Sequence, residues 1–277
     1  MRVTINQIKE MKQKGEKITM LTAYDYSTAK IIDEAGIPLI LVGDSLGMVM
    51  LGYESTIPVT MEEMLHHTKA VVRGTRQAMI IGDMPFMTYH LSVEQALGNA
   101  ARFIQEAGAQ AVKLEGGVTV AEKVRRVVEC GIPVMGHIGL TPQSVYQLGG
   151  LKVQAKSLET ATRLIEDAQV LEQAGAFSIV LEAVPYKLAS LVTQKVSVPT
   201  IGIGAGPDCD GQVQIINDML GSFTDFVPKH AKQYAKLTDI IRKAVTEYDN
   251  EVKAGTFPTE KHSFIMDESV VAELRAK

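Results

Sequence analysis

The chain has 277 residues, of which 46% are hydrophobic and 22% charged, and its formal net charge is −4. This composition is typical of a globular protein, and it lacks the excess of basic residues that binds nucleic acid or an anionic membrane. No apolar run reaches the roughly 18 residues that cross a bilayer, and the first residues, MRVTINQIKEMKQKGEK, lack the apolar core of a signal peptide. We therefore expect a cytoplasmic protein whose two distant cysteines, Cys130 and Cys209, are reduced thiols.

Short apolar segments alternate with helical patterns along most of the chain. Most of these segments are apolar throughout, which is typical of parallel strands that are covered on both faces. The predicted strands are ITMLTAY (18–24), PLILVGD (38–44), QAMIIGD (77–83), AVKLEGG (111–117), PVMGHIG (133–139), FSIVLEAV (177–184), PTIGIGAG (199–206) and a weaker DFVP (225–228).

The segments between the strands carry apolar residues three and four positions apart, as an amphipathic helix does. The pattern predicts helices over 93–107 and 158–171, and a long last helix over 237–248. Four of the helical patterns end on a glycine shortly before the next strand, a residue that ends a helix cheaply in the left-handed conformation. These glycines stand in EAGIP (34–38), EAGAQ (106–110), ECGIP (129–133) and QAGAF (173–177).

Eight strand–helix units in a chain of this length favour a single (βα)8 TIM barrel domain, of α/β class, over residues 1–277. The main alternative is a doubly wound open sheet, which would carry a glycine-rich phosphate turn after its first strand. Tyr24, Asp25 and Tyr26 stand there instead. The longer loops, 45–60 and 140–157, follow strands and precede helices, so we expect them on the catalytic rim of the barrel.

Five of the predicted strands carry an ionisable side chain at or close to their carboxyl end, directly after the apolar run. In a parallel barrel the carboxyl ends of all strands surround one mouth, so these groups converge although they are distant in sequence. Lys113 stands two residues before Glu115, and the alternation of a strand sends both side chains to the barrel axis. The five strand-end residues are Asp44, Asp83, Glu115, His137 and Glu182.

Each of these residues taken alone has an ordinary structural explanation. A short polar residue between a strand and a loop commonly forms a turn or caps a helix, and we place Asp25 and Ser92 in that class. A lone histidine is commonly a hydrogen-bonded structural residue, and Lys113 with Glu115 is explained by an ion pair. Several carboxylates in one buried mouth nevertheless repel one another unless a cation or protons neutralise them.

The chemistry of these side chains favours a hard divalent cation. Carboxylates with little sulfur and few histidines suit magnesium, with manganese as the alternative, better than zinc. A metal with open positions binds the carboxylate and keto oxygens of a 2-oxo acid and stabilises the enolate formed when the adjacent carbon loses a proton. Glu182, across the mouth and among the apolar residues of SIVLEAVP, is the candidate base, and Lys113 adds positive charge.

Several multi-residue motifs in order carry a resemblance to a known family. They are VGDSLGMVMLGYEST (42–56), IGDMPFMTY (81–89), VKLEGG (112–117), GHIGLTPQSV (136–145), LEAVP (181–185) and IGIGAG (201–206). From about residue 2 to residue 264, the chain resembles the ketopantoate hydroxymethyltransferases (3-methyl-2-oxobutanoate hydroxymethyltransferases).

The resemblance implies a barrel of the phosphoenolpyruvate/pyruvate type and a homodecameric assembly. It also implies the committed step of pantothenate biosynthesis. In that reaction a hydroxymethyl group passes from 5,10-methylenetetrahydrofolate to 3-methyl-2-oxobutanoate, giving 2-dehydropantoate and tetrahydrofolate.

The family's site residues map onto matching positions of this sequence. By resemblance, Asp44 and Asp83 ligate Mg²⁺, and Glu115 is the third carboxylate of the metal site, with water as one way to reach the ion. Ser45 and Lys113 bind the keto acid together with the two aspartates. Glu182 is the proton acceptor, and His137 belongs to the same mouth as a substrate-binding residue. We assign no site residue to the loop 84–95 or to the tail after residue 264.

Three other functions use some of the same residues. One is a magnesium-dependent carbon–carbon lyase or phosphonomutase of the same barrel type, although such enzymes usually carry a cysteine-containing loop where this chain has LTPQSVYQLGG. Another is an aldolase that forms a Schiff base through Lys113. The third is a metabolite-binding protein without catalysis, which does not need a base opposite its metal.

Overall fold

Eight parallel strands close into a barrel in the computed structural model, which describes residues 1–277. Each strand pairs with the next one along the chain, and β8 pairs with β1, so that Met20 lies opposite Val213. The closed ring confirms the barrel and excludes the open sheet. The strands are β1 (Ile18–Thr22), β2 (Leu39–Val42), β3 (Met79–Asp83), β4 (Ala111–Glu115), β5 (Val134–Gly139), β6 (Ser178–Glu182), β7 (Thr200–Ile203) and β8 (Gly211–Gln214).

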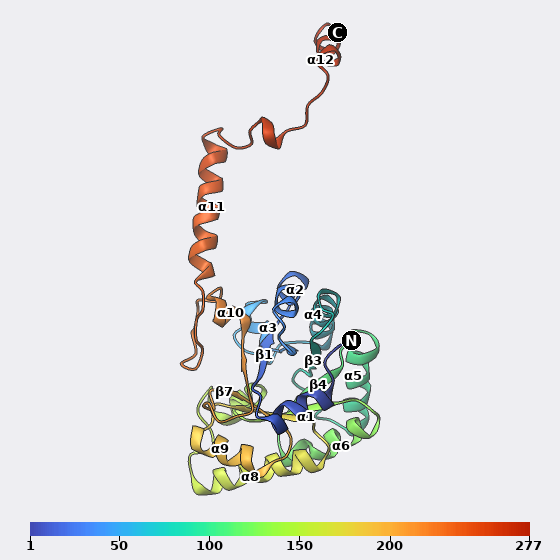
Figure 1. Ribbon diagram of the computed structural model, residues 1–277, viewed down its shortest axis with the longest axis vertical. Coiled ribbons are helices and arrows are strands. Elements are labelled where there is room, and N and C mark those ends of the chain that lie inside the picture. Colours follow the sequence, from blue (N-terminus) through green and yellow to red (C-terminus); the bar gives the residue numbers. More distant parts are fainter.

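Helices cover the outside of the barrel, while the last two lie away from it (Figure 1). The α-helices are α1 (Ile5–Lys14), α2 (Tyr26–Glu34), α3 (Leu46–Val49), α4 (Met61–Gly74), α5 (Val93–Gln105), α6 (Ala121–Glu129), α7 (Val145–Leu148), α8 (Leu158–Gln173), α9 (Tyr186–Lys195), α10 (Ile216–Leu220), α11 (Leu237–Lys253) and α12 (Glu268–Arg275). Three short 3₁₀ helices are η1 (Val118–Val120), η2 (Pro142–Ser144) and η3 (Glu260–His262).

The helix ends confirm the local signals in the sequence. Asp25 and Ser92 accept hydrogen bonds from the third residue of α2 and α5, so both are caps, as predicted. The four glycines that were expected to end helices, at positions 36, 108, 131 and 175, all have φ between 76° and 95°. This is the left-handed region in which a side chain would be strained.

The eighth strand is the one element whose prediction was wrong. The segment 225–228 forms no strand, and the residues of β8, GQVQ, take its place. With two glutamines and a glycine, this strand has one apolar side chain, that of Val213, and lacks the continuous apolar run that marks the others. Gly211 and Val213 are buried, and a Cβ on Gly211 would lie 2.3 Å from the backbone oxygen of Ile18, so only glycine permits the close pairing with β1.

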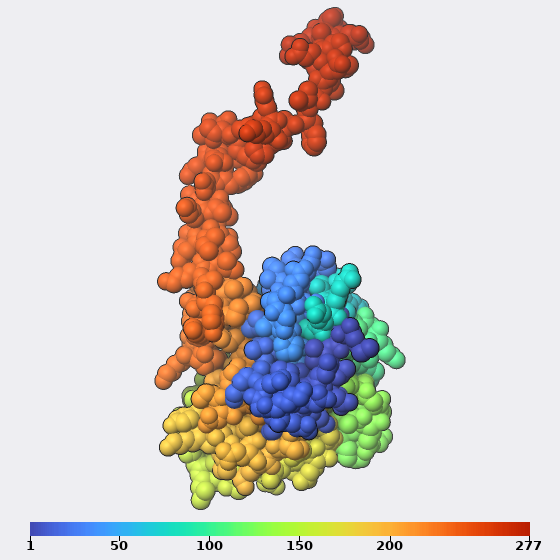
Figure 2. Space-filling model, in the orientation of Figure 1, coloured from blue at the N-terminus to red at the C-terminus, as the bar shows by residue number.

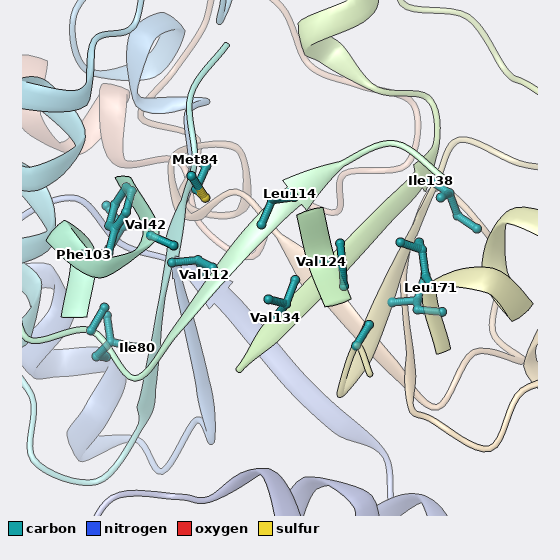
Figure 3. Close-up of a cluster of buried hydrophobic side chains, with 14 of the residues drawn as sticks. Val42, Ile80, Met84, Phe103, Val112, Leu114, Val124, Val134, Ile138 and Leu171 are labelled. Atoms are coloured by element: carbon teal, nitrogen blue, oxygen red, sulfur yellow. The ribbon is translucent and has the colours of Figure 1, made fainter. Parts of the chain in front are cut away.

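Apolar side chains fill two layers, one between strands and helices and one inside the barrel. Ile80 belongs to the outer layer, where Figure 3 shows it with Phe103 and Val112, whereas its neighbours Met79 and Ile81 point inwards. Ile8 of α1 is fully buried in the inner layer. The barrel is therefore closed by α1 at the amino-terminal ends of its strands, and its only open end is the opposite one.

The C-terminal segment stands apart from the barrel, as the space-filling view shows (Figure 2). α11 contains no buried residue. Apolar side chains nevertheless recur along it at helical spacing, and Ile241, Val245 and Tyr248 are each more than half exposed. No helix of the chain has the length and apolar character needed to span a membrane.

Candidate active site

The strand ends bring the predicted polar residues together at the open end of the barrel. Asp44, Asp83, Glu115, His137 and Glu182 all line one cavity of about 380 Å³. Loops 45–60 and 140–157 supply part of the same cavity wall, which confirms their predicted place on the rim.

Short contacts connect these side chains across neighbouring strands. The backbone N–H of Asp44 donates to Asp83 Oδ2 at 3.2 Å, and Lys113 Nζ lies 2.9 Å from Asp83 Oδ1. Lys113 Nζ is also 2.9 Å from His137 Nδ1, and His137 Nε2 is 3.1 Å from Glu182 Oε2. The chain of contacts thus runs from β2 to β6, as the strand-end pattern predicts.

The backbone around β3 and β4 determines where these side chains point. Lys113 Nζ lies 3.8 Å from Glu115 Oε1, so the two alternate residues of β4 both face the mouth. Gly82 precedes Asp83, and a Cβ there would lie 2.2 Å from Cδ1 of Phe103. The missing side chain allows α5 to pack directly on β3.

The electrostatics of the mouth reflect several charges enclosed together. Burial, then the charges of Asp83 and Glu115, raise the pKa of Asp44 well above its ordinary value. Burial and Glu115 also raise the pKa of Asp83, although Lys113 opposes the shift. Burial alone would lower the pKa of Lys113, but the three carboxylates Asp83, Glu115 and Asp44 raise it instead. The raised pKa favours the charged form of Lys113, which argues against the Schiff-base function, since that chemistry needs a neutral amine.

His137 lies between the lysine and two carboxylates. Burial and Lys113 lower the pKa of His137, yet the adjoining carboxylates of Glu115 and Glu182 raise it to about 9. At the strand ends, one lysine and one histidine, Lys113 and His137, face four carboxylates, those of Asp44, Asp83, Glu115 and Glu182. Even with the histidine protonated, full ionisation of the carboxylates leaves an excess of negative charge.

The donor set fits a hydrated hard cation. Asp83 Oδ1 and Glu115 Oε1 are buried without a hydrogen bond, although Lys113 Nζ lies 2.9 Å from the first and His137 Nδ1 lies 3.3 Å from the second. No three His, Cys, Asp or Glu side chains of the chain surround a point closely enough to hold a metal by themselves. Magnesium typically uses one or two carboxylates and completes its shell with water and substrate oxygens, so a partial carboxylate shell suits it.

Two residues that the sequence analysis did not single out hold the carboxylates in place. Gln143 donates from Nε2 to Asp44 Oδ2 at 2.9 Å and from its backbone N–H to Glu115 Oε2 at 3.0 Å. The hydroxyl of Tyr89 donates to Gln143 Oε1 at 2.7 Å and accepts from the backbone N–H of Glu115. The loop 84–95, to which no site residue was assigned, therefore supports the site. Both residues stand in quoted motifs, TPQSV and PFMTY, which was the available signal.

Ser45 lines the cavity beside Asp44 and makes one side-chain contact. Its Oγ lies 2.8 Å from the hydroxyl of Tyr24, whose side chain is fully buried at the end of β1. The buried tyrosine fixes the serine hydroxyl at the wall between the ends of β1 and β2.

The backbone at Glu182 is held from both sides. Ala183 has φ of 46°, an unfavourable value for a residue with a Cβ, and its N–H donates to Ile203 O while its carbonyl accepts from Gln154 N. Gly139 of the neighbouring β5 has φ of 94°, and a Cβ there would lie 2.4 Å from Glu182 O. The surrounding strands thus fix the turn that follows Glu182.

Solved structures of the same architecture are similar to this one at low sequence identity. Phosphonopyruvate hydrolase in complex with oxalate and Mg²⁺ has a TM-score of 0.59 at 14% identity, over 99% of this chain and 95% of that one. 2,3-Dimethylmalate lyase, a member of the PEP mutase/isocitrate lyase superfamily, has a TM-score of 0.58 at 14% identity over the full length of both chains. These likenesses show the fold.

Sequence relatives are far more similar. A 3-methyl-2-oxobutanoate hydroxymethyltransferase of Dehalococcoides mccartyi is 70% identical over 99% of both chains. The enzyme of the same name from Clostridium botulinum is 60% identical over 99% of this chain and all of that one. The family model described as ketopantoate hydroxymethyltransferase matches residues 2–260. The chain belongs to the ketopantoate hydroxymethyltransferase family.

Proposed function

We propose that this protein transfers a hydroxymethyl group from 5,10-methylenetetrahydrofolate to 3-methyl-2-oxobutanoate, giving 2-dehydropantoate and tetrahydrofolate in pantothenate biosynthesis. The observation that carries the proposal is the buried group of carboxylates around Lys113, in a chain that matches hydroxymethyltransferases over its whole length. The named relatives favour this reaction over the lyase and phosphonomutase alternative, whose representatives share the fold at about 14% identity.

We propose that Asp44 and Asp83 hold a magnesium ion, with Glu115 reaching it directly or through water. Bound there, magnesium supplies a positive charge to the carboxylate and keto oxygens of the substrate. The oxalate and Mg²⁺ of the phosphonopyruvate hydrolase complex support this choice, because oxalate has the same pair of adjacent oxygens. The excess of negative charge in the mouth supports a divalent cation over a neutral occupant.

We propose that Glu182 removes the proton from C3 of the keto acid. The carboxylate is mostly buried and stands across the cavity from the aspartates, where a bound substrate would separate the two. His137 Nε2, 3.1 Å from Glu182 Oε2, fixes the position of this base. Lys113 and Ser45 bind the oxygens of the keto acid, and the charge of Lys113 stabilises the negative charge that develops on the keto oxygen.

The nucleophilic C3 carbon then attacks the methylene carbon of the folate in its iminium form, which forms the new C–C bond. Water then replaces the folate nitrogen on that carbon, so that the C–N bond breaks, tetrahydrofolate leaves and 2-dehydropantoate carries the hydroxyl group. The proposed metal ligands, keto-acid residues and base account for the first half of this reaction. They activate the keto acid at the bottom of the cavity and leave the side facing the loops open to the folate.

We also propose that the protein acts in the cytoplasm as a homodecamer, as its family resemblance implies. The exposed apolar stripe on α11 supports an assembly, since a helix with no buried residue keeps these side chains in water in the single chain. Light scattering coupled to size-exclusion chromatography measures the mass. A monomer at micromolar concentration would contradict the assembly.

The experiment that tests the proposed function is exchange of the C3 proton of 3-methyl-2-oxobutanoate into deuterated water, followed by NMR. We expect exchange with Mg²⁺, loss of exchange after chelation, and 2-dehydropantoate once methylenetetrahydrofolate is added. Cleavage of a 2-methylisocitrate-like substrate without folate-dependent turnover would favour the lyase alternative. Borohydride trapping of substrate on the protein, unaffected by a chelator, would favour the Schiff base.

A further inference from the structure

The cavity extends well beyond the residues that the keto acid needs. Its volume of about 380 Å³ is far larger than a small branched keto acid. Besides the buried polar residues at the strand ends, its wall includes apolar side chains from the loops that follow the strands. Among them are Met48, Val49, Val153, Phe223 and Phe226.

Asp218 on α10 lines this cavity and is the one buried carboxylate of the chain without a partner. The residue is 4% exposed, yet its side chain makes no hydrogen bond and no ion pair. Burial alone raises the pKa of Asp218 to about 6. The other four buried acids each have a hydrogen-bond or charge partner; they are Asp33, Asp44, Asp83 and Glu115.

The neighbours of α10 place Asp218 beside the keto-acid end of the cavity. The backbone N–H of Ile216 donates to Thr22 Oγ1 at 3.0 Å, which joins the start of α10 to the end of β1. Asp218 is close enough to Tyr24 for its charge to raise the pKa of the phenol, after the larger effect of burial. Since Tyr24 contacts Ser45, Asp218 lies on the same wall as the proposed keto-acid residues.

A buried carboxylate with free oxygens best accepts two parallel N–H donors, as it does from a guanidinium group. The aminopyrimidine half of a pterin offers such a pair, its ring N–H and the adjacent exocyclic amine, on a flat ring that apolar and aromatic side chains contact well. We propose that Asp218 binds this edge of the pterin and thereby orients the folate co-substrate over the keto acid. The inference rests on the proposed function, because it assigns a contact to that co-substrate.

The first test compares Asp218→Asn with Asp225→Asn, an exposed aspartate on the segment that follows α10. Calorimetric titration with tetrahydrofolate, in the presence of Mg²⁺ and the keto acid, should show binding weakened on the order of 10- to 100-fold in Asp218→Asn only. Proton exchange at C3 without folate should persist in both variants. The apo Asp218→Asn protein should unfold at a higher temperature than wild type, because an unpaired buried carboxylate has been removed.

The second test uses a tetrahydrofolate analogue in which a methyl group replaces the 2-amino group. It should bind wild type more weakly than tetrahydrofolate, and it should bind Asp218→Asn nearly as well as tetrahydrofolate does, since the contact is already lost. Unchanged tetrahydrofolate affinity in Asp218→Asn, or loss of keto-acid exchange in that variant, would overturn the inference. A wild-type protein that neither exchanges the proton nor binds tetrahydrofolate would reject the proposed function itself.

Discussion

Both ends of the barrel hold charged groups largely out of water, but they treat them differently. At the amino-terminal end, Asp33 accepts hydrogen bonds from three successive backbone N–H groups, and Lys12 donates to three carbonyls and pairs with Asp210 at 3.0 Å. At the open end, Asp83 and Glu115 each keep a buried oxygen without a hydrogen bond.

The charged groups at the amino-terminal end stabilise the fold, whereas those at the open end are suited to bind a ligand. A buried charge whose hydrogen bonds are complete stabilises the fold, whereas a buried carboxylate oxygen that has an ion pair but no hydrogen bond can still accept a further partner, such as a cation. The crowded carboxylates at the open end therefore lower the free energy of unfolding of the free protein. Binding of a cation and an anionic substrate raises it again.

The largest expected effect concerns the proposed base. Glu182→Gln should slow C3 proton exchange by about 10²- to 10⁴-fold, the usual contribution of a general base, while it keeps the binding of Mg²⁺ and keto acid. Deuterium incorporation followed by NMR measures it. Glu166→Gln, on the exposed face of α8, is the matched control. Undiminished exchange in Glu182→Gln would remove this residue from the role of base.

Metal affinity is the next test of the open end. Asp83→Asn should weaken Mg²⁺ binding by about 10- to 100-fold, because the site loses a charged ligand. Calorimetric titration with Mg²⁺ in the presence of keto acid measures the change, and the exposed Asp208→Asn serves as control. Equal Mg²⁺ affinity in Asp83→Asn and wild type would show that the metal lies elsewhere.

The same substitution at the two ends should change stability in opposite directions. Asp33→Asn should lower the free energy of unfolding by about 2 kcal/mol, because three backbone donors lose a charged acceptor. Asp44→Asn should raise it by about 1 kcal/mol in the presence of a chelator, because repulsion from Asp83 and Glu115 is relieved. Urea denaturation compares both with wild type. Changes of the same sign would contradict the contrast between the two ends.

The smallest expected effects are changes with pH in the stability differences between these two variants and wild type. Although burial opposes it, hydrogen bonds from the backbone of Ala78, Arg76 and Gln77 lower the pKa of Asp33. Its stabilisation is therefore complete above the unfolded pKa, about 3.9, and is lost as the pH falls below that value.

For Asp44 the pKa is raised, so the sign reverses. Its penalty is absent below about pH 3.9 and grows as the pH rises towards the folded value. The advantage of Asp44→Asn over wild type in chelator should thus shrink on acidification from neutral pH, where the deficit of Asp33→Asn is still constant. Denaturation midpoints at several pH values measure both. An Asp44→Asn advantage that increased on acidification would contradict the assignment.

The sequence predicted most of the barrel because its signals are local. Apolar runs, helix-ending glycines and caps at Asp25 and Ser92 depend on neighbouring residues only. The strand-end rule then placed five ionisable groups at one mouth without any contact being known. β8 escaped because its four residues, two of them glutamines, fold as a strand only between β7 and β1, and that pairing is not visible in the segment itself.

The parts of the site that escaped depend on contacts between distant loops. Gln143 contacts Asp44 across 99 positions of sequence, and Tyr89 contacts Gln143 across 54. Asp218 follows the strand that was misplaced, so the strand-end rule could not bring it to the mouth. Neither residue type nor spacing identifies such supporting groups. They are identified by the hydrogen bonds that Gln143 and Tyr89 make in the structure and by the absence of any for the Asp218 side chain.

Because α1 closes one end of the barrel, reactants can enter the active site only at the other end. Ile8 and its neighbours seal the far end, so whatever reaches the acidic residues at the strand ends must pass the loops where the folate is proposed to lie. The deeper reactant therefore has to enter first and leave last. Steady-state kinetics should then show a compulsory order in which the keto acid precedes the folate and tetrahydrofolate departs before the hydroxymethylated product.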